Sequence, residues 1–401
     1  MRIDSLLKEL YSHQQGQIKL DLSRMERLSK MLDHPERKIR AIHVAGSNGK
    51  GSTCAFLFSI LREAGYSVGF YSSPHLRHFN ERIRMDDQYI ADKDIVRLYA
   101  QVKRHLAGDE TFFEITTMMA FLYFAEKNPD FVLLEVGLGG RLDATNIATP
   151  LLSVITRIDL EHTDILGTTL QSIAREKAGI VKKNVPVATS AKDGAFLVIK
   201  RRARKKNAPL SASLRWKKTA QGLSINGHAG LILGLKGDHQ RENAALALTA
   251  IKVLEKKRLI SIPKGAVVGG LRKARWPGRM EYLSKNILMD CAHNATGMGF
   301  LEKEMQKIRK DKIIVMGTLR DKDISAMMKI ACRNAKLIVL TTPNSERAAM
   351  PEELAKFATT PCLIVPDPMD ALKEAKRMAK KGDLIVLTGS IYLMGEYLDP
   401  L

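Results

Sequence analysis

The chain has 401 residues, of which 45% are hydrophobic and 27% are charged, and its formal net charge at pH 7 is +21. This composition is typical of a folded globular protein, and the length suits two or three domains, of which two is the simpler expectation. The apolar runs are far shorter than the roughly 20 residues of a membrane-spanning helix, and the polar amino terminus has no apolar signal core, so we expect a cytoplasmic protein without a membrane partner.

The cysteines and the excess of positive charge limit the classes of site and partner. Four cysteines are widely spaced, without a Cys-x-x-Cys pair, so neither a disulfide framework nor a structural zinc site is indicated. A basic surface attracts anions such as nucleotides, polycarboxylates and nucleic acid. Much of the charge lies in the runs Lys200–Asn207 and Lys376–Lys381, which contain no aromatic residue for base stacking. We interpret both runs as solvated helix faces, with an anion-contacting patch as the alternative.

In roughly the first two thirds of the chain, short apolar runs alternate with helical patterns, which is typical of a parallel sheet with helices on both faces. The predicted strands are 40–46, 66–72, 131–137, 151–158 and 185–190. The predicted helices are 50–65, 113–127, 170–180 and 239–257. We interpret the residues between Lys206 and the last of these helices as excursions at the rim of this domain.

A second alternating series predicts a complete five-stranded α/β unit. Its strands are expected at 286–292, 312–317, 336–342, 362–366 and 383–389. The boundary is placed in segment 272–281, where a Trp-Pro-Gly sequence breaks the helical pattern. We therefore expect an α/β protein with a mostly parallel domain over residues 1–275 and a smaller α/β domain over residues 276–401. Binding sites in such folds lie beyond the carboxyl ends of the strands.

Segment His43–Thr53, HVAGSNGKGST, resembles a phosphate-binding loop, although it departs from the common pattern G-x-x-x-x-G-K-[ST]. It follows a predicted strand and opens a helix, which is the context in which backbone N–H groups and a helix N-terminus face an anion. Lys50 would then place a point charge on the phosphates, and Ser52 or Thr53 would place a hydroxyl on Mg²⁺. The alternative is a glycine turn that merely joins strand to helix.

Polar residues also follow the next strands of this domain. Glu135 ends a strand before a glycine-rich segment, where its carboxylate is suited to hold Mg²⁺ or to pair with Arg141. The following strand leads into a polar loop with Asp159, Glu161, His162 and Asp164. Lys177 ends an amphipathic helix, where the helix dipole favours a cation.

Further polar groups occur near the boundary and in the second unit. His239 and Asn243 are expected at positions i and i+4 of one helix face, where capping by Asp238 is the structural alternative. Two strands of the second unit lead into polar loops that carry Asp290, His293, Asn294, Asp321 and Lys322. Each of these sites admits a purely structural explanation, so none identifies a function alone.

Eleven motifs taken together resemble one family. In chain order they are GSNGKGS, YSSPHL, FFEITT, LEVGLGGRLDATN, DLEHTDILG, REKAGI, GDHQRENA, WPGRME, DCAHN, GTLRDKD and TGSIYLMGE. This set is similar to that of the folylpolyglutamate synthases and dihydrofolate synthases of the Mur ligase superfamily, from about residue 15 to residue 396. The loop of that family has the shortened form G-x-x-G-K-G-[ST]. One position departs from the family pattern, because Cys291 replaces the glycine of Asp-Gly-Ala-His-Asn.

The resemblance implies a P-loop-type ATPase domain at the amino terminus and a Rossmann-like ligase domain at the carboxy terminus. Such enzymes use ATP to activate a carboxylate as an acyl phosphate, which the amine of glutamate attacks to form an amide. The implied acceptors are dihydropteroate and a reduced folate in the same site, which places the protein in folate biosynthesis and one-carbon metabolism. The stretches similar to pteroate-binding segments are 72–76, 112–116 and 13–28. We expect a monomer without a specific nucleic-acid partner.

The resemblance also implies roles for individual residues. The phosphates and the nucleotide are expected to meet Gly46, Asn48, Gly49, Lys50, Gly51, Ser52, Thr53, Asn243, Arg279 and Asp290. One Mg²⁺ is expected at Ser52 and Glu135, and His162 is expected to contribute to a second. Catalytic roles are implied for Lys50, His162, Lys177 and His293. Lys177 matches a lysine that becomes carbamylated, which turns a cation into an anionic group that is able to meet metal.

Two alternatives stay open. A ligase of the same superfamily could act on another carboxylated acceptor, such as a modified pterin or a UDP-linked cell-wall precursor. The cell-wall ligases normally carry an extra amino-terminal domain, whereas only about 40 residues precede the loop here. A nucleic-acid-binding P-loop protein would suit the charge, but no helix-turn-helix, zinc or aromatic-basic module is apparent. Weak, salt-dependent binding of nucleic acid is expected from the charge alone.

Overall fold

The computed structural model describes residues 3–13, 21–220, 222–225 and 227–398, which form two compact units. The first unit comprises Met1–Gly234 and Arg241–Ala274, and the second comprises Leu235–Gln240 and Arg275–Leu401. Segment Leu235–Gln240 thus packs with the second unit, although the sequence pattern places it in the first. The reason is a tertiary contact, because the imidazole of His239 stacks on the ring of Phe300 with 4.8 Å between ring centroids.

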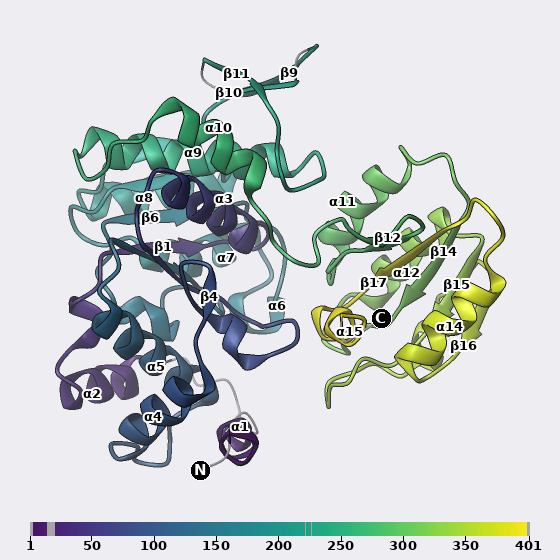
Figure 1. Cartoon of the computed structure of the whole chain (residues 1–401), viewed down its shortest axis with the longest axis horizontal. Coiled ribbons are helices and arrows are strands. Elements are labelled where there is room, and N and C mark those ends of the chain that lie inside the picture. Colours follow the sequence, from purple (N-terminus) through teal and green to yellow (C-terminus); the bar gives the residue numbers. More distant parts are fainter. Residues whose placement is uncertain (1–2, 14–20, 221, 226, 399–401) are drawn as a thin grey trace. The chain divides into compact units, whose positions relative to one another are not determined.

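An eight-stranded sheet in the order β4-β3-β2-β5-β1-β6-β7-β8 forms the centre of the first unit (Figure 1). Its strands are β1 Ala41–Ala45, β2 Val68–Tyr71, β3 Ile83–Met85, β4 Gln88–Tyr89, β5 Phe131–Glu135, β6 Leu152–Ile155, β7 Val187–Thr189 and β8 Leu210–Ala212. Six neighbouring strands run parallel, namely β2, β5, β1, β6, β7 and β8, whereas β3 and β4 form an antiparallel edge. All residues of β1 and β5 are buried, as expected for central parallel strands. The prediction of a mostly parallel α/β fold is confirmed.

Helices cover this sheet in the first unit. They are α1 Ile3–Ser12, α2 Ser23–Met31, α3 Lys50–Glu63, α4 Asp92–Lys103, α5 Phe112–Lys127, α6 Thr163–Leu166, α7 Leu170–Lys177, α8 Asp193–Lys205, α9 Gln240–Lys256 and α10 Lys264–Lys273. Short 3-10 turns are η1 Pro35–Arg37, η2 Phe79–Arg82, η3 Ala144–Ile147 and η4 Ala178–Ile180. Because α9 begins at Gln240, His239 lies before the helix, and its predicted shared helix face with Asn243 is wrong.

The stretch after Lys206 contains more regular structure than its pattern indicates. β8 adds a parallel strand to the main sheet beside β7. A separate antiparallel sheet follows, formed by β9 Trp216–Thr219, β10 Gly222–Ile225 and β11 His228–Leu231. Figure 1 shows this small sheet next to α9 and α10. Its strands have only four residues each and are partly exposed, which leaves little hydrophobic pattern to predict them from.

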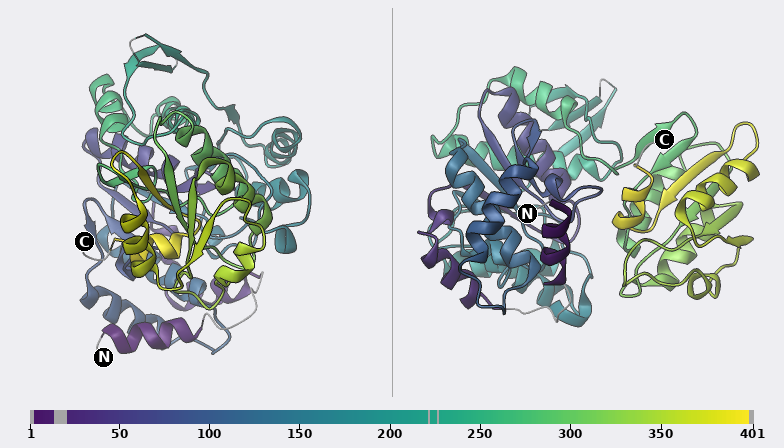
Figure 2. Two further views of the ribbon diagram at one scale, coloured as in Figure 1. Left: turned by 90° about the vertical axis from the view of Figure 1, so that its right-hand side faces the viewer. Right: turned by 60° about the horizontal axis from the view of Figure 1, so that its bottom comes forward.

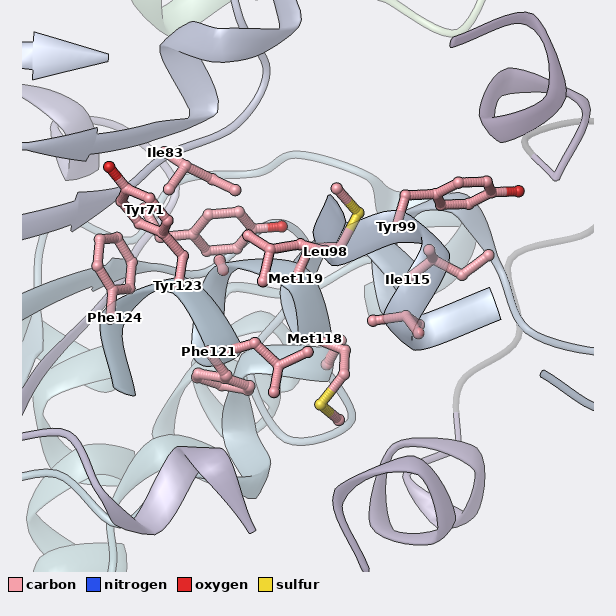
Figure 3. Packing of buried hydrophobic residues seen from close by; sticks show 14 of the residues in the cluster. Tyr71, Ile83, Leu98, Tyr99, Ile115, Met118, Met119, Phe121, Tyr123 and Phe124 are labelled. Carbon is pink, nitrogen blue, oxygen red and sulfur yellow. The ribbon is translucent and has the colours of Figure 1, made fainter. Parts of the chain in front are cut away.

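The helix α5 is the centre of a large hydrophobic core on one side of the sheet. It begins with a capping box, in which the side chain of Thr111 accepts from the N–H of Glu114. Figure 3 shows side chains of this core from α5, α4, β2 and β3 packed together. The hydroxyl of Tyr71, at the end of β2, lies 3.2 and 3.0 Å from the hydroxyls of Thr116 and Thr117. This core therefore fixes the segment after β2 against the first turns of α5.

The second unit has a six-stranded sheet in the order β12-β13-β17-β14-β15-β16. Its strands are β12 Glu281–Ser284, β13 Ile287–Met289, β14 Lys312–Met316, β15 Leu337–Leu340, β16 Cys362–Ile364 and β17 Leu384–Thr388. Its helices are α11 Ala295–Met305, α12 Ile324–Asn334, α13 Pro351–Ala355, α14 Pro368–Met378 and α15 Ile391–Glu396. The five predicted strands correspond to β13–β17, while the antiparallel edge strand β12 is an addition. Figure 2 shows helices on both faces of this sheet, as expected for a Rossmann-like unit.

Candidate functional site

The predicted phosphate loop joins the carboxyl end of β1 to the first turn of α3, and two of its glycines leave no room for a side chain. A Cβ atom on Gly46 would lie 1.7 Å from the hydroxyl oxygen of Thr156. Gly49 has a φ of 89°, and a Cβ there would lie 2.3 Å from Oδ1 of Asn243. The structure thus places Asn243 of α9 against the loop. The closely approached backbone and the first N–H groups of α3 form the kind of cradle that holds phosphate.

Residues after β6 hold the loop in place. The hydroxyl of Thr156 donates to the carbonyl of Asn48 at 2.8 Å. The side-chain amide of Asn48 in turn donates to the carboxylate of Asp159 at 2.9 Å. The hydroxyl of Ser47 donates to the carbonyl of Asp159 at 3.0 Å, and Arg157 pairs with the carboxylate of Asp159 at 2.8 Å. These contacts brace the loop against the segment that follows β6.

Two ammonium groups converge on this loop. Nζ of Lys50 donates to the carbonyl oxygens of Gly46 and Ser47 at 2.9 and 3.3 Å. Nζ of Lys177, at the end of α7, donates to the same carbonyl of Gly46 at 2.9 Å and pairs with Glu161 at 2.7 Å. Burial lowers the pKa of Lys177, the charge of Glu161 opposes this effect, and the charge of Lys50 reinforces it. The two lysines, which are far apart in sequence, thus form one positively charged site.

The sequence pattern marks Glu161 only as one of several potential ligands in a polar loop, and the structure instead pairs it with Lys177. Burial raises the pKa of its carboxyl, but the charges of Lys177 and Lys50 outweigh that effect and set the pKa to about 2. Glu161 is therefore ionised at neutral pH and neutralises the buried Lys177. Its position in the crowded polar loop next to His162 was the one signal in the sequence that pointed to it.

The predicted metal ligands lie near the same loop. Ser52 is in the first turn of α3, and Glu135 is the last residue of β5, where it pairs in register with Val44 of β1. The charges of Glu135 and Lys50 both act on the thiol of Cys54 in α3, so the carboxylate and the ammonium group face the same part of that helix. His162 immediately precedes α6 and adjoins Glu161.

The donor set of these residues suits Mg²⁺. Within the described residues, no group of three or more His, Cys, Asp or Glu side chains is arranged to hold a metal ion. Mg²⁺ normally keeps several waters and takes one or two carboxylates together with the phosphates of a substrate. A hydroxyl from Ser52 and a carboxylate from Glu135 beside a phosphate cradle therefore fit a magnesium ion that arrives with a nucleotide.

The glycine-rich segment after Glu135 is shaped by Asp143. The carboxylate of Asp143 accepts from the N–H groups of Gly137 and Leu138 at 3.0 and 2.9 Å. The hydroxyl of Thr145 donates to Asp143 and lies 2.8 Å from Nε2 of the buried His43. This chain of hydrogen bonds connects β1 to the glycine-rich segment.

The alternative partner that the sequence offers for Glu135 is Arg141. The guanidinium of Arg141 instead forms an ion pair with Glu176 of α7 at 3.1 Å. The backbone N–H of Arg141 also donates to the carbonyl of Glu176 at 2.8 Å. These contacts attach the glycine-rich segment to the end of α7, next to Lys177.

Acid is expected to destabilise the protein through His43. Burial lowers the pKa of His43 from 6.5 to about 3, so the unfolded chain takes up this proton at a higher pH than the folded one. The stability that the neutral imidazole contributes is present above pH 6.5 and is lost as the pH falls toward 3, with about 2–3 kcal/mol lost by pH 4.5. Urea unfolding between pH 7 and 4.5 checks this expectation. A His43→Gln variant should show a shallower pH dependence, and equal slopes in the two proteins would contradict it.

Gly49 and Gly65 allow the cost of backbone strain to be measured apart from the cost of the contact between Gly49 and Asn243. Gly49 and Gly65 both have a φ of 89°, but a Cβ on Gly65 would meet nothing within 4 Å. Gly65→Ala should cost only the left-handed backbone penalty of about 1 kcal/mol. Gly49→Ala should cost at least about 1 kcal/mol more, because Asn243 must move, and it should also weaken nucleotide binding. Thermal unfolding and ADP titration measure the two effects, and equal behaviour of the variants would refute the contact.

The second unit contains three predicted site residues close together, which are Arg279 and Asp290, expected to meet the nucleotide, and His293, expected to act in catalysis. The carboxylate of Asp290, directly after β13, accepts from the N–H of Met280 at 2.9 Å. Burial raises the pKa of Asp290, and the positive charge of Arg279 opposes that effect. Nδ1 of His293 lies 2.9 Å from the carbonyl of Cys291. These side chains thus lie at the carboxyl end of a strand, where α/β units bind ligands.

Other residues that the sequence draws attention to in this unit have structural partners. The side chain of Asn294 caps α11 by accepting from the N–H of Gly297 at 2.7 Å. Lys322 pairs with Asp321 at 2.7 Å. The side chain of Cys291, which departs from the family pattern, is 2% exposed and is therefore accommodated in the protein interior.

The three predicted pteroate-binding stretches come together in the structure. Nε of Arg82 donates to Nδ1 of His75 at 2.7 Å, and its guanidinium carbon lies 5.0 Å from the ring centroid of Phe112. Burial, followed by the charge of Arg82, lowers the pKa of His75 to about 3. Residues 14–20 of the third stretch, 13–28, lie outside the described residues. Its described part reaches the second stretch, because the guanidinium of Arg24 pairs with the carboxylate of Glu114 at 3.0 Å and the N–H of Phe112 donates to the carbonyl of His13 at 3.3 Å.

Comparison with known proteins shows that the similarity to Mur ligases covers nearly the whole chain. Residues 44–251 match the Mur ligase middle domain, and residues 278–391 match the Mur ligase glutamate ligase domain. The dihydrofolate synthase/folylpolyglutamate synthase of Bacillus subtilis is 38% identical over 405 aligned residues, covering 94% of both chains. No helix in the described part of the chain has both the length and the apolar character needed to cross a membrane.

Solved structures agree in fold. The structure of Escherichia coli FolC in complex with DHPP and ADP has a TM-score of 0.92 and 30% identity, and it covers 100% of this chain and 97% of that one. A bifunctional synthase of Yersinia pestis, complexed with AMPPNP and a Mn ion, has a TM-score of 0.89 and 29% identity, with coverage of 99% and 97%. Because relatives at 30% identity or more align over nearly their full length, the chain belongs to the dihydrofolate synthase/folylpolyglutamate synthase family of Mur ligases.

Proposed function

We propose that this protein joins the amine of glutamate to the carboxylate of both dihydropteroate and reduced folates in a single site. The protein is an ATP-dependent acid–amino-acid ligase of folate metabolism. The observation that carries the proposal is the convergence of Lys50 and Lys177 on the carbonyl of Gly46, inside a braced glycine loop. The names of the relatives support the choice of acceptors, since the Bacillus subtilis protein is named for both activities.

The chemistry needs an activated carboxylate, because a free carboxylate is a poor electrophile. ATP, when bound, supplies the phosphoryl group that turns one carboxylate oxygen into a leaving group. The loop backbone and Lys50 would bind and neutralise the phosphates, while Ser52 and Glu135 would hold one Mg²⁺. The further contacts to the nucleotide and substrate are proposed for Gly46, Asn48, Gly49, Gly51, Thr53, Asn243, Arg279, Asp290 and His293.

A second metal position at His162 and a carbamylated Lys177 are part of this proposal. Carbamylation joins the neutral amine of Lys177 to CO₂ with release of a proton, and burial lowers the pKa of Lys177, which favours the neutral amine. The carbamate would place a negative group beside His162. Supplying ¹³C-bicarbonate should produce a carbamate carbon signal in the NMR spectrum that is absent in Lys177→Met. A spectrum without this signal would remove the carbamate from the proposal.

The acceptor is tested by phosphate release from Mg-ATP and glutamate, with dihydropteroate and tetrahydrofolate offered separately and the products identified by mass. Turnover with both acceptors is the expected result. Turnover with tetrahydrofolate alone would mean an enzyme that only extends the glutamate tail. If neither reacts, the folate substrate is wrong, and a modified pterin becomes the acceptor to examine. A cytoplasmic, monomeric enzyme stays a prediction that fractionation and light scattering can check.

A further inference from the structure

A second concentration of positive charge in the first unit involves none of the proposed site residues. It combines the end of α8 with the turn that precedes β7, and we call it the α8 patch. Its members are Lys182, Lys183, Arg201, Arg202, Arg204, Lys205 and Lys206. Arg201, Arg204 and Lys205 are exposed, as the expectation of a solvated helix face requires. Lys182, Arg202 and Lys206 are only partly exposed, so they do not fit a fully solvated helix face.

The backbone holds these three cations together. The N–H of Asn184 donates to the carbonyl of Lys206 at 2.9 Å. The side-chain amide of Asn207 donates to Oδ1 of Asn184 at 3.2 Å. These two bonds attach the turn with Lys182 to the end of α8. Arg202 precedes Lys206 by four residues and therefore lies on the same side of the helix end.

The three cations have no acidic partner in an ion pair among the described residues. The ion pairs in this part of the chain use other cations, as in Arg141–Glu176 and Lys192–Glu242. Nε of Arg202 is buried and has no hydrogen-bond acceptor within the described part of the chain. Because Arg202 as a whole is partly exposed, the terminal N–H groups of its guanidinium are the ones that an anion can reach.

The positive charges of Lys182, Arg202 and Lys206 repel one another. Burial, and then the charges of Lys206 and Arg202, lower the pKa of Lys182 to about 8, while the exposed Glu26 of α2 acts weakly in the opposite direction. Nζ of Lys182 is held by the carbonyl of Asn146 at 2.6 Å. The ammonium group is thus kept in place beside two other cations, and an anion between them would relieve the repulsion.

We propose that Lys182, Arg202 and Lys206 form a binding site for a linear polyphosphate anion. The planar fork of an arginine matches the geometry of phosphate oxygens, and lysines add point charges along a phosphate chain. The exposed large aromatic residues of the described chain, which are Tyr89, Trp216, Tyr282 and Phe357, lie in other elements, so the patch offers no platform for nucleic-acid bases.

A lipid surface is the less suitable partner for the same patch. α8 turns Ala195, Ile199 and Ala203 into the core. Leu197 of this helix is exposed, but a single leucine does not provide the apolar face that inserts into a membrane. Attraction at this site is therefore electrostatic and is directed to the phosphate groups themselves.

The proposal is tested by titrating the full-length protein with sodium tripolyphosphate in a calorimeter. The variant Arg202→Gln/Lys206→Gln removes two charges from the patch without breaking an ion pair between described residues. Lys376→Gln/Lys381→Gln is the matched control, because it removes two exposed charges from the other basic run. Any tripolyphosphate that binds at the phosphate loop does so in all three proteins, so a difference between them reports the α8 patch.

We expect the control to bind like the unmodified protein and the patch variant to lose at least about tenfold in affinity for one class of site. Equal weakening in both variants would reduce the effect to overall charge and overturn the proposal. Absence of binding in the unmodified protein would do the same. A short RNA and phosphatidylglycerol vesicles are titrated in parallel. If either depends on Arg202 and Lys206 while tripolyphosphate does not bind, the partner is a nucleic acid or a membrane instead.

Discussion

Lys50→Ala should reduce glutamate ligation by at least about a thousandfold while leaving the protein folded. Nζ of Lys50 already lies within the loop, where it contacts the carbonyls of Gly46 and Ser47, so it is pre-positioned to neutralise phosphate charge. These two bonds are its polar contacts in the described structure, and the loop keeps its bracing through Thr156 and Asp159 without them. The loss should therefore appear in turnover and not in stability.

The measurement is single-turnover phosphate release together with the melting temperature by circular dichroism. Lys50→Arg is the informative second variant, because it keeps the charge but replaces a compact ammonium group with a larger planar fork. We expect it to recover part of the nucleotide affinity and little of the turnover. Near-normal turnover in Lys50→Ala would refute the assignment of the loop.

The central strands could be predicted from the sequence because of their burial. β1 and β5 are buried at every position, which produces the continuous apolar runs that predicted them. β9–β12 escaped prediction because they are short and partly exposed, so neither alternation nor a long apolar run marks them. The placement of His239 with the second unit depends on its stacking on Phe300, a tertiary contact that no local pattern encodes.

The sequence motifs identified the residues of the candidate site, but they did not predict which of these residues contact one another. The glycine loop has a local signature, so Gly46 and Gly49 could be named from the sequence. The close approach of Thr156 to Gly46, and the pairing of Lys177 with Glu161, join different elements that only the folded sheet brings together. A family resemblance implied a role for Lys177, but it did not identify the carboxylate that neutralises this residue.

Lys177→Met should be both inactive and unstable, and the two effects have separate causes. Lys177 is 2% exposed and pairs with Glu161 at 2.7 Å. Removing it leaves a buried carboxylate without its partner, which typically costs 3–5 kcal/mol. The nearby charge of Lys50 also acts on Glu161, so we expect the lower end, about 3 kcal/mol. Urea unfolding measures this loss.

The double variant Lys177→Met/Glu161→Gln distinguishes a structural lysine from a functional one. Both charges are then absent, so the energetic cause of the instability is removed, and most of the lost stability should return. Turnover should stay at least about a hundredfold below that of the unmodified protein, because no amine remains to contact the loop or to accept CO₂. Glu161→Gln alone controls for loss of the carboxylate. Recovery of turnover together with stability in the double variant would mean that Lys177 serves the fold alone, and that Lys50 carries the positive charge of the site by itself.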